Sequence, residues 1–492
     1  MRQSVDGAAD EALARMGYKS ELPRNLSMLS VLGLSFAIMA APYGLSTTLY
    51  ITLVDGLSVT IIWGWVFVTL ISIAIAASLA EICAVFPTAG GVYYWSAMLA
   101  TPKYAPVMSF IDGWLTLVGN WTVTLSIIFG GGQLILSAIS LWNVDFVANT
   151  WQTILMFWAV LLVCTLVNIF MSRHLDLINK VCIYWTASSV VIILVVLLVM
   201  GRHNLNSGEF VFAHYDSSQS GWPAGWAFFV GLLQAAYTLT GYGMVASMCE
   251  EVQNPHREVP KAIVWSVVAA GFTGIIYLIP ILFSMPNVTA LRNVLSGQPI
   301  GLLFKEVTGS AGGGFGLSLP YPGHHDLRRR CTYAFARDGA IPGFKIWRRV
   351  NKKLNVPVWA VILSALVDAL LGLIYFGSSA AFNSFTGVAT ICLSTSYGLP
   401  IFICMVRGRK AVKGSGLPVT AGSMNYASAV FAGFASISVA WYFAYARKHF
   451  AGPPVSEEAR VAGTGVIAGS PVDLESHVHE VDIKKEVSSS KE

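Results

Sequence analysis

Ten apolar stretches, each close to or above the roughly 20 residues that a helix needs to cross a bilayer, follow one another along this chain. They lie near residues 30–54, 58–85, 107–139, 152–170, 181–201, 224–247, 261–285, 357–377, 382–406 and 425–445. Charged residues make up only 12% of the chain, against about 25% in soluble globular proteins. Such a surface is poorly suited to water, so the sequence predicts an all-α, multi-pass integral membrane protein.

Polar segments flank the apolar region on both sides. Residues 1–27 are predicted to form a cytoplasmic N-terminal segment and residues 451–492 a disordered tail, because few apolar residues are available there to form a core. Between them, residues 28–450 are expected to fold as one membrane domain, with a first half at about 28–201 and a second half at about 224–406.

Basic residues predict the orientation of this domain, because Lys and Arg concentrate in cytoplasmic loops. Arg173 and Lys180, between the fourth and fifth stretches, and Arg257, after the sixth, fit the cytoplasmic side if the N-terminus is cytoplasmic. The sequon that begins at Asn287 then falls outside, which makes Asn287 a candidate for glycosylation. Orientation explains the modest net charge of +5 better than nucleic-acid binding does, because the basic residues lie in short loops.

Two intervals of the chain are each one crossing short. The loop after the sixth stretch and residues 328–353 both have cytoplasmic charge, yet one good stretch separates them, and the same holds for residues 407–413 and 446–450. In the first interval "VTGSAGGGFGL" begins as a small-residue membrane helix and then turns into "SLPYPGHHDLRRR", which does not suit a lipid-exposed helix. A loop is one explanation, and a shifted reading frame or mis-joined exon is the favoured one. The second interval, near 413–425, is interpreted as a deletion.

Two of the apolar stretches are interrupted near their middle. The first contains Ala41-Pro42-Tyr43-Gly44, and the sixth contains Thr240-Gly241-Tyr242-Gly243. Unwound backbone is tolerated inside a membrane only where it lines a cavity or is buried in protein. Packing kinks explain either interruption alone, but a matched pair, one opening each half of the chain, indicates a transporter built from inverted repeats.

Ionisable residues within the apolar stretches are candidates for gating or coupling, because each is costly to insert into a membrane. Glu81 and Asp112 lie near the ends of the second and third stretches, and Asp368 lies in the middle of the eighth. Glu250 and Glu251 end the sixth stretch, where they form either an ordinary solvated helix end or a cytoplasmic gate that exchanges partners with basic loop residues. Asp368 is a possible proton relay.

Enzyme chemistry finds little support in the sequence. All nine histidines fall outside the apolar cores, the seven cysteines are scattered singly, and neither H-E-x-x-H nor a glycine-rich phosphate loop occurs. We therefore expect neither a catalytic centre nor a metal or other cofactor. A receptor that binds a nutrient without transporting it remains an alternative, although the C-terminal tail contains no evident signalling domain.

Three long motifs resemble a known family. "AEICAVFPTAGGVYYW" (80–95), "GYGMVASMCEEVQNPHREVPKAI" (241–263) and "CTYAFARDGAIPGF" (331–344) are similar to the fungal amino acid/choline transporters of the amino acid–polyamine–organocation permeases. This resemblance implies a twelve-span, LeuT-like fold of two inverted five-helix repeats. It also implies secondary transport of choline, GABA or amino acids by alternating access, usually with a coupled proton. Against that pattern, most of the eighth span and essentially all of the eleventh are missing.

The resemblance also implies a substrate site at the two interruptions. The residues that correspond to it are Ala41, Pro42, Tyr43, Gly44, Leu45, Ser46, Thr238, Thr240, Gly241, Tyr242 and Gly243. Pro42 offers no N–H, so capture of a carboxylate would rest on the amides of Gly44 and the two residues after it. Tyr43 and Tyr242 offer aromatic faces to an ammonium group, each worth about 0.5–2 kcal/mol, which favours a choline-like cation.

A second departure from the family concerns coupling. Some proton-coupled relatives carry a lysine in the fifth span, and the corresponding residue here is Thr186. The sequence thus predicts a plasma-membrane permease for a small nitrogen-containing solute, with no fixed lysine charge in its coupling. A vacuolar or other organelle location, and export or compartmentation of an alkaloid-like metabolite, are the alternatives within transport.

Overall fold

The computed structural model describes residues 28–143, 145–171, 175–294, 297–318, 326–351, 356–377 and 381–407. The chain divides into two compact units, Met1–Ala427 and Ser428–Glu492, and every described residue lies in the first. The predicted N-terminal segment, the stretch at 425–445 and the C-terminal tail therefore lie outside the described residues.

Helices make up the membrane domain, and within the described ranges the only strand-like feature is a single bridge between Asn351 and Val356. The long elements of the first half are α2 (Met28–Met39), α3 (Ala41–Thr47), α4 (Leu49–Val54), α5 (Leu57–Val85), α7 (Ala105–Trp142), α8 (Thr150–Phe170) and α9 (Leu175–Met200). Those of the second half are α11 (Ala224–Gly231), α12 (Leu233–Thr238), η3 (Tyr242–Glu251), α13 (Pro255–Phe283), α19 (Val358–Gly372), η4 (Leu373–Phe376) and α20 (Ala381–Val406).

Shorter helices connect these elements. They are α6 (Val92–Leu99), η2 (Gly201–His203), α10 (Gly208–Phe212), α14 (Val288–Arg292), α15 (Pro299–Thr308), α16 (Ala311–Ser318), α17 (Asp326–Arg337) and α18 (Phe344–Trp347). Eight helical segments among the described residues are long and apolar enough to cross a membrane. The broken first stretch folds as helices α2 to α4, so the nine described apolar stretches are all helical, as predicted.

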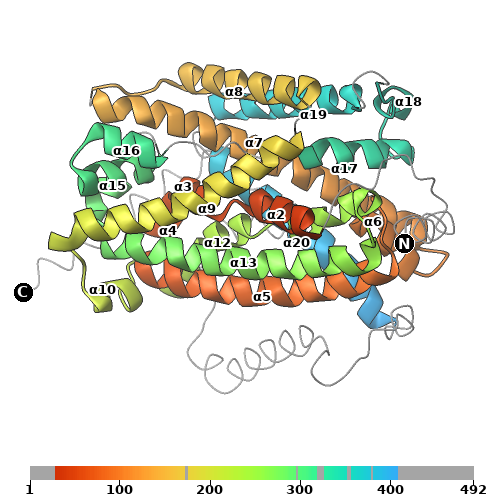
Figure 1. Ribbon diagram of the computed structural model, residues 1–492, viewed down its shortest axis with the longest axis horizontal. Helices are drawn as coiled ribbons and strands as arrows, with labels where there is room; N and C mark the ends of the chain where they lie inside the picture. Colours follow the sequence, from red (N-terminus) through yellow and green to blue (C-terminus); the bar gives the residue numbers. More distant parts are fainter. Residues whose placement is uncertain are drawn as a thin grey trace, which may run out of the picture. The chain divides into compact units, whose positions relative to one another are not determined.

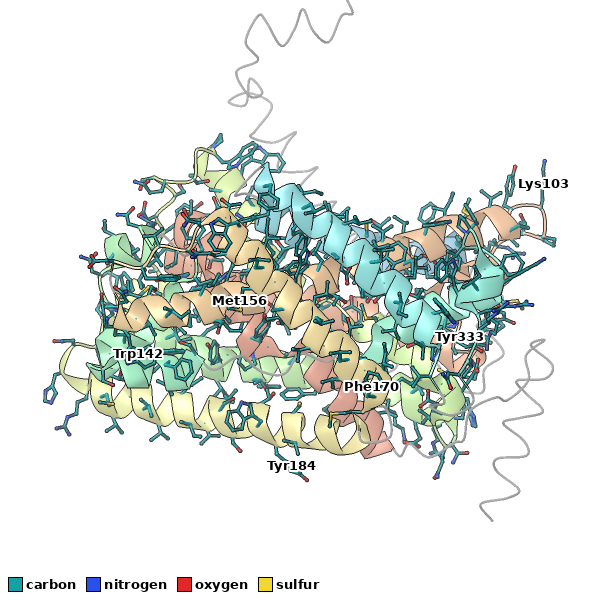
Figure 2. All side chains as sticks on the ribbon, turned by 90° about the horizontal axis from the view of Figure 1, so that it is seen from above. Lys103, Trp142, Met156, Phe170, Tyr184 and Tyr333 are labelled. Atoms are coloured by element: carbon teal, nitrogen blue, oxygen red, sulfur yellow. The ribbon has the colours of Figure 1, made fainter. Side chains whose placement is uncertain are left out.

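Apolar side chains on α8 and α9 face outward, as expected for helices in contact with lipid. Figure 2 shows Tyr184 projecting from α9 away from the other helices, and 73% of its surface is exposed. The other exposed apolar residues of α8 and α9 include Trp151, Leu155, Trp158, Leu162, Val163, Leu166, Phe170, Trp185, Val191, Ile192 and Val195. The main core lies instead between α5, α13, α2 and the two interrupted spans.

The short helices gather at the two ends of the long ones. Helices α10, α15 and α16 lie at one end, where α7 finishes at Trp142, and α6, α17 and α18 lie at the other (Figure 1). We call the Trp142 end the outer end and the opposite one the inner end, following the orientation that the basic residues predict. At the inner end, Arg407 after α20 donates to the carbonyls of Leu99 and Ala100, both at 2.8 Å.

Helices α16 and α17 flank the interval in which an eighth span is expected, and each contacts α7. The ring of Phe315 on α16 lies 5.2 Å from that of Trp142 at the outer end of α7, and Phe335 on α17 lies 6.0 Å from Trp114 at the inner end. Residues 311 to 337 number 27 by subtraction, about 40 Å as a continuous helix and enough to cross. The interval is therefore long enough for a membrane crossing, but the polar residues within it do not suit one. No described segment between Phe283 and Val358 qualifies as a membrane span.

Candidate functional site

The first interrupted span breaks at Ala40. This residue adopts the left-handed conformation, with φ of 34°, between α2 and α3, although a residue with a Cβ rarely does so. Pro42 then falls in the first turn of α3, where a missing N–H breaks no helical hydrogen bond. The predicted break is confirmed, and Pro42 begins a new helix rather than disrupting one.

Hydrogen bonding at this break changes the view of carboxylate capture. The amides of Tyr43 and Gly44 both donate to the carbonyl of Ala40, at 2.8 and 3.1 Å. The expectation that the Gly44 amide is open to a ligand is therefore wrong, because the first turn of α3 already uses it.

The sixth span breaks at the residues that follow α12. Gly241 has φ of 113°, a conformation that favours glycine, and the hydroxyl of Thr240 donates to the carbonyl of Ala236 at 2.6 Å. The chain resumes as η3, a 3₁₀-helix of ten residues. Runs of this length are uncommon and often mark a hinge or a strained segment. The predicted break in this span is also confirmed.

The two interrupted spans meet in the centre of the unit. A Cβ added to Gly44 would lie 2.7 Å from Oγ1 of Thr238, so glycine is required for this close approach. Gln234 on α12 donates through Nε2 to the carbonyl of Leu45 at 2.8 Å and accepts from Thr52 Oγ1 at 2.9 Å. Sequence reasoning missed Gln234, although a single amide side chain within an apolar stretch was a usable signal.

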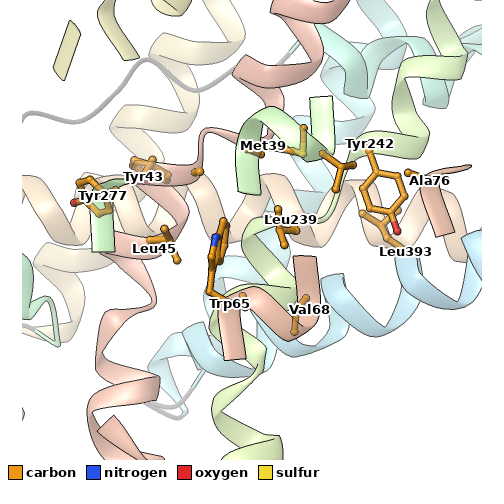
Figure 3. Packing of buried hydrophobic residues seen from close by; sticks show 14 of the residues in the cluster. Met39, Tyr43, Leu45, Trp65, Val68, Ala76, Leu239, Tyr242, Tyr277 and Leu393 are labelled. Carbon is orange, nitrogen blue, oxygen red and sulfur yellow. The ribbon is translucent and has the colours of Figure 1, made fainter. Parts of the chain in front are cut away.

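The two tyrosines of the predicted site have separate surroundings. Figure 3 shows Tyr43 and Tyr242 well apart, with Leu239 between them. The hydroxyl of Tyr43 donates to the carbonyl of Ile127 at 2.5 Å. The ring of Tyr242 packs on that of Tyr397 from α20, with 4.9 Å between centroids. The structure therefore does not bring Tyr43 and Tyr242 around one ammonium group.

The outer part of α3 also makes a contact that the sequence did not suggest. Ser46, a predicted site residue, shares a 2.6 Å hydrogen bond with the hydroxyl of Tyr277 on α13. Ala41, Pro42 and Leu45 are buried in the main core beside it. All eleven predicted substrate-site residues thus lie at or beside the two breaks, in two groups joined where Gly44 meets Thr238.

Glu250 lies at the inner end and is only 3% exposed. Its Oε2 lies 3.6 Å from Nη1 of Arg337 on α17, and its Oε1 accepts from the amide of Ala89 at 3.3 Å. We call the Glu250–Arg337 pair the inner latch. A solvated helix end is therefore the wrong interpretation for Glu250, and its partner comes from a distant helix rather than from the loop that follows η3.

The other candidate gating and coupling residues come from four different elements. Glu251 and Glu81 are half-buried near the inner ends of η3 and α5. Asp368 is fully buried on α19, which packs on α7, α8 and α17. Thr186 is buried on α9, which packs on α2, α13 and α15. Their roles in gating or coupling remain predictions.

An ion pair at the outer end was not anticipated from the sequence. Arg292 on α14 lies 2.8 Å from Oδ2 of Asp216 and donates through Nε to the carbonyl of Leu53 at 2.7 Å. Hydrogen bonds from Ser218, and then Arg292, lower the pKa of Asp216 to about 2. We call the Asp216–Arg292 pair the outer latch. Asn287, at the same end, is exposed at the start of α14.

Two cavities lie on opposite sides of the junction between the interrupted spans. The outer cavity has a volume of about 280 Å³, and its lining includes Gln133, Ser137 and Lys305. The inner cavity has a volume of only about 20 Å³ and lies beside Gly243 and Tyr397. Of these two cavities, the outer one is the larger.

Residues 26–456 match the family model described as "Amino acid permease". The chain belongs to the amino acid permease family. It is 32% identical over 423 residues to the polyamine transporter TPO5 of Saccharomyces cerevisiae, which covers 83% of this chain and 68% of the relative. It is 30% identical to the amino-acid permease BAT1 of Arabidopsis thaliana over 90% of this chain and 95% of that one. It is 26% identical to the choline transporter of Saccharomyces cerevisiae over 87% of this chain and 83% of that one.

Membership of this family confirms the coarse predictions from the sequence. The permease is a multi-pass membrane protein with a LeuT-like, all-α fold, and it is a transporter rather than an enzyme. Its relatives place it among secondary transporters of small nitrogen-containing solutes. The interrupted helices and the junction of Gly44 with Thr238 thus belong to a transport protein.

Proposed function

We propose that the permease carries an organic amine or amino acid, such as choline, GABA or an amino acid, by alternating access at the junction of its two interrupted spans. The observation that carries this proposal is the direct meeting of Gly44 with Thr238, held by Gln234. Interrupted helices of the two repeats enclose the substrate site in transporters of this architecture. The named relatives, which include a polyamine, a choline and an amino-acid permease, fit this range of solutes.

Among these solutes we favour an organic cation. The amide of Gly44 is already bonded to Ala40, so one donor for a carboxylate is removed. Tyr242 remains beside the break of the sixth span, with its ring buried against Tyr397. An aromatic ring in a dry site attracts an ammonium group more strongly than one in water.

The latches supply a basis for alternating access. One ion pair closes the outer end and another closes the inner end, so opening toward either side requires one of them to break. Rocking of one helix bundle about the central site would break them in turn. Proton coupling, if present, would use Asp368 or a carboxyl group of the solute, because Thr186 carries no charge.

The test is flux into sealed vesicles that contain the purified full-length chain. Tyr242→Ala should abolish saturable uptake of radiolabelled choline, putrescine or GABA, whichever the unmodified permease transports. Tyr184→Ala, which removes an exposed tyrosine from α9, is the matched control and should leave uptake unchanged. Binding without flux in the unmodified chain would instead identify a receptor.

We further propose that the permease acts in the plasma membrane, with Asn287 on the outside. Localisation of a tagged chain tests the membrane, and a vacuolar signal would favour the compartmental alternative. Alternating access is reversible, so the permease should exchange solute across a vesicle membrane in both directions. The solute gradients would then set the physiological direction of transport.

A further inference from the structure

The inner cavity has an aromatic lining. It lies among η3, α6, α7, α17 and α20, and its walls include the rings of Tyr93, Phe335 and Tyr397. Tyr93 and Phe335 are 5.3 Å apart between centroids, and the hydroxyl of Tyr93 is held by Oδ2 of Asp338 at 2.8 Å. None of the described residues that line the cavity is charged. A carboxylate would therefore find no counter-ion in these walls, whereas a cation would find three aromatic rings.

One hydroxyl group in the same lining makes no hydrogen bond with any described residue. It belongs to Thr116 on α7, which is 8% exposed. Buried polar groups normally find a partner, so each such exception needs an explanation. Because Thr116 lines the cavity, a water molecule or a polar group of a ligand in it is the natural partner of this hydroxyl.

A buried carboxyl group lies on the same helix, one turn before Thr116. Asp112 is fully buried, and its Oδ2 accepts from the hydroxyl of Ser96 at 2.5 Å. Its Oδ1 has no partner among the described residues. The next residue along the chain, Gly113, lines the cavity. In its ionised form, this carboxyl group adds to the attraction of the aromatic walls for a cation.

We propose that the inner cavity is a binding subsite for the ammonium head of the transported solute, distinct from the junction of Gly44 and Thr238. This inference rests on the proposed function and narrows the solute to organic ammonium compounds over zwitterions. The rings of Tyr93, Phe335 and Tyr397 face the cation. The hydroxyl of Thr116 serves a hydroxyl or N–H group of the same solute.

The size of the cavity links this subsite to the inner latch. The volume of the cavity is about 20 Å³, little more than the roughly 10–15 Å³ that one water molecule needs. An alkylammonium head therefore requires the walls to separate. Helix α17 carries both Phe335, which is a wall, and Arg337, which forms the latch with Glu250. Breaking the latch frees the helix that must move for the subsite to open.

Binding of tetramethylammonium to the purified full-length permease, measured by calorimetry, tests the subsite without relying on transport. Phe335→Leu should weaken this binding about tenfold through loss of an aromatic face. Phe129→Leu, the same change at a buried ring in a separate cluster, is the matched control and should bind as the unmodified chain does. Phe335→Tyr keeps the ring and should bind normally, which guards against a folding defect in the leucine variant.

A second pair of ligands tests the Thr116 hydroxyl. Thr116→Val should weaken binding of choline while leaving tetramethylammonium unaffected, because only choline carries a hydroxyl. Absence of tetramethylammonium binding, or equal losses in Phe335→Leu and Phe129→Leu, would overturn the subsite. Equally tight binding of 3,3-dimethylbutan-1-ol, the uncharged analogue of choline, would also overturn it. Vesicle flux is measured separately, so a permease that transports solutes but fails the binding test would lose only the subsite.

Discussion

The outer and inner latches use the same pair of groups in different surroundings. In the outer latch, Asp216 and Arg292 lie 2.8 Å apart and are 30% and 13% exposed. In the inner latch, Glu250 and Arg337 lie 3.6 Å apart and are 3% and 18% exposed. Water and salt therefore reach the shorter pair more readily than the longer one.

This difference shows that distance alone does not rank the two latches. Exposed ion pairs contribute about 0–1 kcal/mol. Removing one partner of a buried pair costs several times more, because the remaining charge has lost its hydration. The outer cavity is also the larger of the two. We therefore expect the inner end to open at greater cost than the outer end.

The largest effect is expected from breaking the inner latch. Glu250→Gln should lower the free energy of unfolding by about 3 kcal/mol, at the low end for breaking a buried pair, because Arg337 is 18% exposed and keeps a second carboxylate, that of Asp338, 3.7 Å from its Nε. Thermal unfolding in detergent measures this, with Glu251→Gln, a half-buried neighbour, as the control. Equal small losses in both variants would show that the pair with Arg337 adds no stability beyond that of a half-buried glutamate.

The next largest effect is expected at the junction of the two interrupted spans. Gly44→Ala places a methyl group 2.7 Å from Thr238 Oγ1, so it should cost about 1–3 kcal/mol in strain and reduce uptake strongly. Gly225→Ala, in the same interrupted span as Thr238 but with nothing within 4 Å, should be silent. Partial recovery in Gly44→Ala combined with Thr238→Ala would locate the defect at this contact, and no recovery would place it elsewhere.

A smaller effect is expected at the outer latch. Asp216→Asn should change stability by about 1 kcal/mol or less, and high salt should remove the difference. Its pKa is lowered to about 2, below the unfolded value of about 3.9, so its contribution is full above pH 4 and is lost as the pH falls towards 2. Unfolding midpoints across pH 3–7 at two salt concentrations measure this, with exposed Glu209 changed to Gln as the control. A loss of stability beginning near pH 6 would contradict the assignment.

The smallest effect should come from Asn287→Gln. Loss of a glycan should shift the electrophoretic mobility of the protein while uptake stays unchanged. Stability should fall by about 1 kcal/mol or less, because the Asn287 side chain caps α14 by accepting from the amide of Thr289 at 2.9 Å. If glycosylation occurs instead at a sequon engineered next to Arg257, the ends named outer and inner are reversed. The contrast between the latches would then refer to the opposite sides of the membrane.

Local chemistry explains which parts of the site could be predicted. The break of the sixth span follows from glycine at position 241, because its φ of 113° disfavours other residues. The break of the first span was located to within a residue or two, although Ala40 rather than Pro42 is the residue outside the helix. Both depend on the few residues around them, so a short stretch of sequence contains the necessary information.

Partners that come from distant parts of the chain could not be predicted in this way. Glu250 meets Arg337, which is 87 positions further on by subtraction, and Tyr242 meets Tyr397. Nothing in the neighbourhood of either residue specifies the helix that packs against it. The wrong expectation of a solvated helix end at Glu250 has the same origin, because burial depends on α17.

The sequence by itself determined the membrane setting, the nine described helical stretches, the two interruptions and the family motifs, because hydrophobic length and backbone preference are local properties. The tertiary structure decided that the interruptions meet at Gly44 and Thr238, that Tyr43 and Tyr242 face different neighbours, and that an ion pair lies at each end. It also showed that α16 and α17 both pack on α7. These outcomes depend on which side chains fill the same space, and only packing of the whole unit settles that.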